Sequence, residues 1–238
     1  MNELLKAIYA TGRVEDKDGN AIDCFPTSVS FETGATLYDL IREHRLSRTL
    51  EVGMAYGMSA LFICQALEDN ALGSHTAMDP VQDTSWKSIG RLNIERAGLK
   101  DRLRFFPGSS HEVLPRLLEA GESFDFAFVD GLHLFDYTLV EFFYIDRMLR
   151  AGGYIAFDDI GLPAVRKAVS FILRNRSYEI VRPRRAGNGV VRSAMSAARR
   201  LAQEPLGRDL ALKLMPGNVC VLKKVADDDR HWKHYSPF

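Results

Sequence analysis

The chain is organised around residues 49–67, which read Thr-Leu-Glu-Val-Gly-Met-Ala-Tyr-Gly-Met-Ser-Ala-Leu-Phe-Ile-Cys-Gln-Ala-Leu. The β-branched and aliphatic residues that open this stretch suit a buried strand. Gly53 and Gly57 bracket a tight turn, where a missing Cβ permits a positive φ or the close approach of a ligand. Apolar residues then recur at helical spacing from Ala60 to Leu67. A strand, a glycine turn and a helix in this order direct backbone N–H groups at the turn, so the stretch predicts a ligand site.

The overall composition limits the class of protein. The 238 residues suit one α/β domain with additions, and an apolar content of 46% allows a large core. The 31 basic and 31 acidic residues cancel, so no overall field favours nucleic acid. No apolar run reaches the roughly 18 residues of a membrane span, and residues 1–12 lack the apolar core of a signal peptide. The three cysteines are unclustered, which disfavours zinc or disulfides and fits a reducing, cytoplasmic location.

Strand and helix patterns alternate from residue 49 onward. Such alternation predicts an α/β fold, with a Rossmann-like, doubly wound and mostly parallel sheet of seven strands and helices on both faces. The predicted strands lie at 49–53, 75–79, 103–106, 124–130, 153–158, 177–182 and 218–224. The predicted helices lie at 58–68, 86–97, 110–119, 134–149 and 163–174.

Two regions stand outside this alternation. Residues 1–46 contain short helical patterns and are interpreted as an N-terminal helical cap, which packs on a sheet edge or covers the glycine turn. Residues 47–238 form the main domain, and residues 183–216 interrupt it with a basic insertion. The insertion is either a solvated or subunit-contacting segment, or a lid that offers positive charge to an anionic substrate.

The glycine turn does not match the dinucleotide-binding fingerprint G-x-G-x-x-G. That fingerprint needs glycine where Ala55 and Met58 stand. Tyr56 also adds bulk where a pyrophosphate would approach. The turn therefore counts against a nicotinamide dinucleotide as the ligand.

An E-x-G-x-x-x-G pattern is present instead, at Glu51, Gly53 and Gly57. It resembles the first motif of class I S-adenosylmethionine-dependent methyltransferases, whose ligand presents an amino acid end. Ser59 can donate to the carboxylate of that end, and Glu51 can help to hold its ammonium group. Asp79 ends the second strand, where an acid can bind both ribose hydroxyls of an adenosyl group or of NAD. The plainer alternatives are a tight structural turn and an Asp79 that caps a helix.

The third strand of the main domain runs directly into the start of a helix. Ser109 and Glu112 form an S-x-x-E capping box, so Ser109 is interpreted as a cap rather than a ligand contact. Ser110 and His111 then lie at the edge of the predicted cleft. They are candidates to contact adenine.

Carboxylates follow the next two strands where those strands end. The fourth strand runs into Asp130, and the fifth runs into Asp158 and Asp159. Three acids at the carboxyl ends of neighbouring strands would repel one another, and a hard divalent cation removes that repulsion. Carboxylate oxygens with water suit Mg²⁺, and also Mn²⁺ or Ca²⁺. The alternative is a set of caps and solvated loop acids.

With these motifs, residues 49–174 resemble the metal-dependent O-methyltransferases typified by the catechol and caffeoyl-CoA enzymes, and still more the bacterial group that includes macrocin O-methyltransferase. The resemblance implies that the stretch Gly108-Ser-Ser-His111 positions adenine, with its histidine in place of the glutamine of the catechol enzyme. It implies that Asp130, Asp158 and Asp159 hold the metal, because their separation is the one expected for the family. A homodimer is a further family-level expectation.

The loop after the fourth strand carries the candidate base. The catechol enzyme has a lysine three positions after its first metal-binding Asp, and His133 occupies that place here. His133 is therefore a candidate base, metal ligand or substrate contact, and an ordinary pKa near 6.5 suits a base at neutral pH. Asp130 is also a candidate to face the ammonium of the cofactor. The implied reaction moves a methyl group from S-adenosylmethionine to a hydroxyl of a small molecule, such as a sugar, polyketide or catechol-like diol.

Other functions share this fold and stay open from the sequence. They are an NAD-dependent oxidoreductase, a related metal-dependent hydroxylase of the cephalosporin-hydroxylase type, and a non-enzymatic module that binds the cofactor. A nucleic-acid methyltransferase is disfavoured, because the overall charge is neutral and no N-P-P-Y-type motif follows the fourth strand. We expect neither nucleic acid nor a membrane as a partner.

Overall fold

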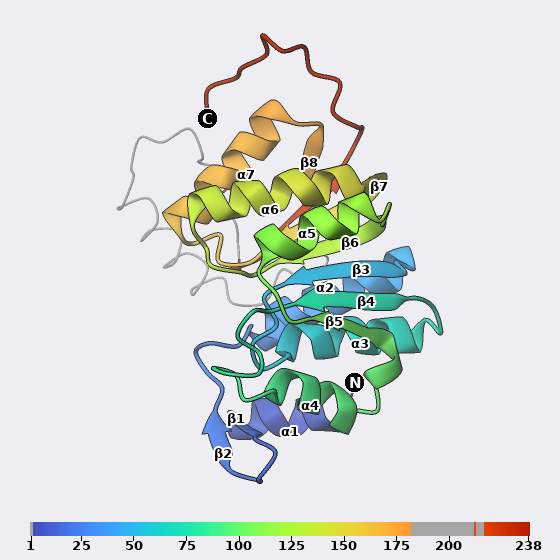
Figure 1. Cartoon of the computed structure of the whole chain (residues 1–238), viewed down its shortest axis with the longest axis vertical. Helices are drawn as coiled ribbons and strands as arrows, with labels where there is room; N and C mark the ends of the chain where they lie inside the picture. The colour runs from blue at the N-terminus through green and yellow to red at the C-terminus, as the bar shows by residue number, and fades with distance from the viewer. Residues whose placement is uncertain (1, 182–211, 213–216) are drawn as a thin grey trace.

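A seven-stranded sheet runs through the centre of the chain, in the order β5-β4-β3-β6-β7-β9-β8 (Figure 1). The computed structural model describes residues 2–181, 212 and 217–238. The strands of this sheet are β3 (Arg48–Val52), β4 (Ser74–Met78), β5 (Leu103–Phe106), β6 (Phe124–Val129), β7 (Leu149–Phe157), β8 (Tyr178–Val181) and β9 (Cys220–Lys224). The strands from β5 to β7 are parallel, and β9 runs antiparallel to both β7 and β8. The predicted mostly parallel, Rossmann-like sheet is confirmed.

Helices cover both faces of the sheet. They are α1 (Glu3–Thr11), α2 (Phe31–His44), α3 (Met58–Asp69), α4 (Ile89–Arg96), α5 (Ser110–Glu119), α6 (Phe135–Met148) and α7 (Pro163–Asn175). In Figure 1, α5 and α6 lie in front of the sheet, whereas α2 and α3 lie behind it. Among the helices of the described residues, none combines the length and apolarity needed to cross a membrane.

The strands alternate between two buried clusters, one on each face. Phe126 and Phe128 of β6 belong to the cluster under α2 and α3. Ala127 and Val129 of the same strand belong to the cluster under α5, α6 and α7. This alternation follows from the two-residue period of a strand, and it explains why β6 is apolar at almost every position.

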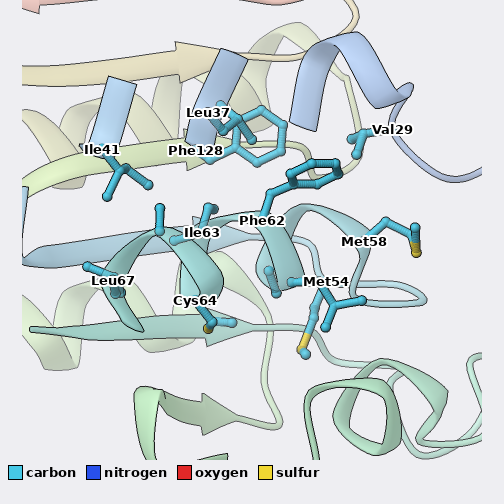
Figure 2. Close-up of a cluster of buried hydrophobic side chains, with 14 of the residues drawn as sticks. Val29, Leu37, Ile41, Met54, Met58, Phe62, Ile63, Cys64, Leu67 and Phe128 are labelled. Atoms are coloured by element: carbon cyan, nitrogen blue, oxygen red, sulfur yellow. The ribbon is translucent and has the colours of Figure 1, made fainter. Parts of the chain in front are cut away.

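The N-terminal region differs from the predicted helical cap in two respects. It contains a short hairpin of β1 (Arg13–Glu15) and β2 (Ala21–Asp23), because Asp16 Oδ1 accepts hydrogen bonds from the backbone N–H groups of Asp18 and Asn20 and closes the turn. The second difference is that α2 packs on a face of the sheet rather than at its edge. Figure 2 shows Leu37 of α2 beside Phe128 of β6, and both side chains are fully buried.

The basic insertion at 183–216 falls outside the described residues except for Leu212, which is buried. Its role therefore stays a prediction. The division of the chain into residues 1–46 and 47–238 also stays a prediction.

A close backbone contact joins the turn after β3 to the loop after β6. Gly53 has φ +84°, and a Cβ added to it would lie 2.1 Å from the carbonyl oxygen of Asp130. The same Cβ would lie 3.4 Å from Cα of Gly131. Gly53 is therefore required both by its left-handed backbone and by the space that the second loop occupies. This contact fixes the two loops that border the predicted ligand site.

We expect Gly53→Ala to destabilise the protein by about 2 kcal/mol more than Gly121→Ala, as measured by urea denaturation. Gly121 is a matched control, because it has φ +71° and no atom within 4 Å of an added Cβ. Both substitutions carry the backbone strain, whereas only the one at Gly53 also adds a clash. Equal losses for the two variants would contradict the close contact with Asp130.

Candidate functional site

The predicted site residues meet where the sheet changes direction. The chain leaves β3 toward β4 and β5 on one side, whereas β6 leads to β7 on the other, so the switch point of the sheet lies at the carboxyl ends of β3 and β6. The backbone N–H of Asp130 donates to the carbonyl of Val52 at 2.9 Å, and that of Asp158 donates to the carbonyl of Val129 at 3.1 Å. These bonds bring both carboxylates to the same edge of the sheet. The prediction that β6 and β7 are neighbours is thereby confirmed.

Asp79 fixes the shape of the glycine turn. One carboxylate oxygen, Oδ2, accepts hydrogen bonds from the backbone N–H groups of Met54 at 3.2 Å and Ala55 at 2.9 Å. The other, Oδ1, accepts from the N–H of Val81 at 2.9 Å. Ala55 has a positive φ of 43°, which costs energy in a residue other than glycine and which these bonds help to hold. The sequence pattern gave Asp79 a ligand role or a helix-capping role, whereas the structure shows that it positions the glycine turn.

Glu51 is fully buried on β3 beside an unexpected partner. Its Oε2 lies 3.3 Å from Nε2 of His75 on β4, and the other ring nitrogen of His75 lies 2.9 Å from the hydroxyl of Thr49. Oε1 of Glu51 has no hydrogen-bond partner among the described residues. Ser59 is buried in the first turn of α3, directly after the glycine turn. The sequence analysis missed His75, although its pairing with Thr49 across β3 and β4 follows from the register.

The two candidate adenine contacts at the start of α5 have different environments. Ser109 closes the predicted capping box with Glu112, which is confirmed. Ser110 is buried, and its hydroxyl donates to Oε1 of Glu141 on α6 at 2.8 Å. His111 is exposed, with its ring edge-on to Tyr137 at a centroid distance of 6.0 Å. Ser110 therefore faces the protein interior, whereas His111 faces outward.

His133 lies between the carboxylates that follow β6 and β7. Its Nε2 is 3.1 Å from Oδ1 of Asp130 and 3.6 Å from Oδ2 of Asp159. His133 and Asp159 both have positive φ values, 56° and 52°. Left-handed backbone at residues other than glycine is sparsely populated, and it concentrates at functional sites. The structure thus brings together His133, Asp130 and Asp159 as one cluster, with Asp158 beside them.

The electrostatics of this cluster favour added positive charge. Burial raises the pKa of the Asp130 and Asp158 carboxyl groups, and the mutual repulsion of the acids raises both further. The hydrogen bond to Asp130 raises the pKa of His133 above its ordinary value of 6.5. Each shift has the direction that lowers the net negative charge of the cluster. A cation between the carboxylates would do the same.

The donor chemistry of the cluster fits a hard divalent ion. Asp130, Asp158 and Asp159 offer only oxygen atoms, which Mg²⁺, Mn²⁺ and Ca²⁺ prefer. Within residues 2–181, 212 and 217–238, however, no group of three His, Cys, Asp or Glu side chains is arranged to hold a metal ion. In the structure the acids are oriented toward His133 and Asn218 instead. The predicted metal role of the three acids therefore stays a prediction.

Asn218 is a site residue that the sequence analysis missed. Its side-chain amide donates to Oδ1 of Asp159 at 2.6 Å and lies 3.5 Å from Oδ1 of Asp158. The antiparallel direction of β9 explains its position, because the start of β9 lies beside the end of β7. In a mostly parallel sheet the polar residues of the site follow the strands, whereas Asn218 precedes a strand that runs antiparallel.

Glu141 is a second missed residue, on the inner side of α6. The side chain is 2% exposed, and burial raises the pKa of its carboxyl group to about 7. Oε2 has no hydrogen-bond partner among the described residues. A buried helical acid gives no distinctive signal in a single sequence, because an exposed Glu on a helix is far more common.

Comparisons with known proteins point to one family. Residues 50–160 match a family described as "Methyltransferase domain", a range that includes the glycine turn and all three acids of the cluster. A caffeoyl-CoA O-methyltransferase from Populus kitakamiensis is 32% identical over 136 residues, which cover 56% of this chain and 54% of that protein. Catechol O-methyltransferase B from Danio rerio is 28% identical over 188 residues, which cover 74% of this chain and 69% of that protein. The chain spans about half the length of the caffeoyl-CoA O-methyltransferases that it matches.

Solved structures share the fold. An O-methyltransferase from Bacillus cereus in complex with SAH has a TM-score of 0.59 at 20% identity, over 75% of this chain and 80% of that chain. The O-methyltransferase TomG from Streptomyces achromogenes, in complex with SAM, has a TM-score of 0.61 at 20% identity, over 76% of this chain and 82% of that chain. At this identity the likeness concerns the fold alone.

We expect Glu141→Gln to stabilise the protein more at pH 8 than at pH 5. The pKa of Glu141 rises from an ordinary 4.5 to about 7 on folding. Between those values the folded state holds a proton that the unfolded state has lost, so wild-type stability falls as pH rises through this window. Glutamine carries no such proton, so its gain over wild type should grow by roughly 3 kcal/mol at most between the two pH values.

Urea denaturation of both proteins at each pH measures this difference. Glu119→Gln is the matched control, because Glu119 is exposed near the end of α5. A gain for Glu141→Gln that is the same at pH 5 and pH 8 would show that Glu141 has an ordinary pKa in the folded protein.

Proposed function

We propose that this chain is a class I S-adenosylmethionine-dependent O-methyltransferase, which transfers the methyl group of S-adenosylmethionine to a hydroxyl oxygen of a small molecule. The observation that carries the proposal is the position of His133 between Asp130 and Asp159, beside the glycine turn of β3. A candidate base, an acidic cluster and a turn suited to a nucleoside ligand thus lie at one switch point of the sheet. The family match over residues 50–160 supports the same conclusion.

The glycine turn would hold the methyl donor. When bound, S-adenosylmethionine supplies an electrophilic methyl carbon on a sulfonium. Gly53 and Gly57 give this turn left-handed backbone at two positions, and Ser59 lies in the first turn of the helix that follows. Asp79 is next to this turn, where a carboxylate can also accept from ribose hydroxyls. Ser110 and His111 begin α5 and are the proposed contacts of the adenine end.

His133 is the proposed base. It would take the proton of the acceptor hydroxyl at Nδ1, because Nε2 faces Asp130 and Asp159 and must carry a hydrogen to donate to the carboxylate of Asp130. The hydrogen bond that His133 donates to Asp130 strengthens the base, because it raises the pKa of His133. The same bond orients the imidazole ring. A ring that is already oriented lowers the entropic cost of reaching the reactive geometry.

A divalent metal is the proposed partner of the acids. Bound to Asp130, Asp158 and Asp159, Mg²⁺, Mn²⁺ or Ca²⁺ would supply a Lewis acid that lowers the pKa of an acceptor hydroxyl. Asn218 would keep Asp159 in place through its amide hydrogen bond. Burial, followed by repulsion between the acids, raises the pKa of Asp130 and Asp158, and a cation between them would offset both effects.

The surroundings of His133 suggest features of the acceptor. Leu132 and Leu134 flank His133 along the chain and are 63% and 51% exposed. Exposed leucines beside a polar cluster suit a ligand that has both an apolar body and oxygen donors. A vicinal diol or hydroxy-ketone would bind a metal through two oxygens, so a catechol-like or polyketide acceptor fits best.

We expect His133→Ala to lower kcat at least about a hundredfold, because general base catalysis contributes about 10²–10⁴ in rate. Initial rates of methyl transfer to a vicinal diol that the wild-type protein turns over measure the effect. His234→Ala is the control, because His234 is an exposed histidine in the C-terminal segment. An undiminished rate for His133→Ala would remove His133 as the base.

We expect excess EDTA to abolish methyl transfer and added Mg²⁺ to restore it, because three adjacent acids need a cation to bind an acceptor oxygen. Calorimetric titration with S-adenosylhomocysteine, measured with and without EDTA, separates loss of catalysis from loss of cofactor binding. Full activity in excess EDTA would contradict metal assistance and leave methyl transfer itself intact.

A further inference from the structure

Glu141 carries a buried carboxylate whose bonding is incomplete. The side chain is 2% exposed, and Oε1 accepts the hydroxyl hydrogen of Ser110 at 2.8 Å. Oε2 is buried and has no hydrogen-bond partner among the residues that the structure describes. A buried carboxylate oxygen without a donor is costly, so such an atom marks a position where a donor is missing.

Glu141 lies close to the loop that borders the proposed cofactor site. A Cβ added to Gly131 would lie 2.9 Å from Oε1 of Glu141 and 3.3 Å from Val52 at the end of β3. Gly131 follows Asp130 and is also approached by Gly53, whose added Cβ would lie 3.4 Å from Cα of Gly131. The carboxylate of Glu141 therefore lies beside Gly131, in the loop after β6 that also contacts Gly53 of the glycine turn.

Two elements converge on this carboxylate. Ser110 belongs to the first turn of α5, and Gly131 belongs to the loop between β6 and α6. Glu141 itself is in the middle of α6, so it holds the start of α5 against that loop. Any side chain at Gly131 would displace Oε1, which explains a glycine at this position without invoking its backbone freedom.

We propose that Glu141 is a cofactor-recognition residue, whose Oε2 accepts a hydrogen bond from the exocyclic amino group of the adenine of S-adenosylmethionine. The inference rests on the proposed function, because that function supplies the adenine. The adenine end is favoured over the amino acid end, since Ser110 ties Glu141 to α5 rather than to the glycine turn. An amino group donates hydrogen bonds, and a carboxylate oxygen accepts them.

The test compares two ligands that differ at this group and at the neighbouring ring nitrogen N1, which carries a hydrogen only in the inosyl ligand. S-adenosylhomocysteine carries the amino group, whereas S-inosylhomocysteine has a carbonyl oxygen there, which would face Oε2 without a hydrogen. Isothermal titration calorimetry at about pH 9, where the Glu141 carboxyl group is ionised, gives Kd for both ligands with the wild-type protein and with Glu141→Gln. We expect the wild-type protein to bind S-adenosylhomocysteine at least tenfold more tightly than the inosyl ligand. We expect Glu141→Gln to reduce this ratio to about threefold or less, because an amide can accept from the amino group or donate to the carbonyl.

Each outcome of this comparison is decisive. If Glu141 only supports the fold, Glu141→Gln weakens both ligands equally and the ratio stays at its wild-type value, which overturns the proposal. A wild-type protein that binds both ligands equally also overturns it. A wild-type protein that binds neither ligand instead contradicts the proposed function and, with it, this inference.

Two further variants keep the test sound. Glu141→Asp keeps the charge but withdraws the carboxylate by one methylene group, so it should also lower the ratio if Glu141→Gln fails to fold. Glu119→Gln, at the exposed end of α5, should leave both Kd values unchanged. Thermal melting of each variant at the pH of the titration identifies any that is unfolded.

Discussion

The approach of Gly53 to the carbonyl oxygen of Asp130 is the constraint on which the site depends. The turn after β3 packs directly against the loop after β6. A Cβ added to Gly53 would lie only 2.1 Å from the carbonyl oxygen of Asp130. The backbone bond from Asp130 to Val52 then holds the second loop in register with β3. Because the carboxylate of Asp130 and the ring of His133 both belong to that loop, their distance from the glycine turn is set by backbone contacts. Side chains that only pack against each other would hold this distance less rigidly, because they can change rotamer.

Charge is the second constraint, and it acts on the same loops. Asp130 and Asp158 follow buried strands, so burial and mutual repulsion both raise the pKa of their carboxyl groups. His133 and Asn218 partly offset this repulsion through contacts with Asp130 and Asp159. Such an arrangement is costly for a protein without a ligand, and the cost falls when a cation binds between the acids. The left-handed backbone of His133 and Asp159 adds to that cost at the same positions.

Several site residues could be predicted from sequence patterns alone, whereas others became visible only in the structure. The acids after β6 and β7 and the capping box at Ser109 follow from local rules, because strand ends and helix starts are visible in the sequence. Asn218 depended on the antiparallel direction of β9, which a mostly parallel alternation does not indicate. Glu141 and His75 face neighbouring elements, and only the packing of α6 and the register of β4 reveal their partners. The hairpin at Asp16 was missed because three-residue strands are too short for a period to show.

The sequence by itself determined the alternation of strands and helices, the glycine turn after β3 and the carboxyl ends at which the acids would gather. These are local properties, because hydrophobic period, turn chemistry and capping act over a few neighbouring residues. The tertiary structure alone decided that α2 covers a face of the sheet and that His133 lies between Asp130 and Asp159. It also decided that Glu141 has a buried oxygen for which the described part of the chain offers no donor. Each of these depends on residues far apart in the chain, whose distances are set only when the sheet order and the helix packing are complete.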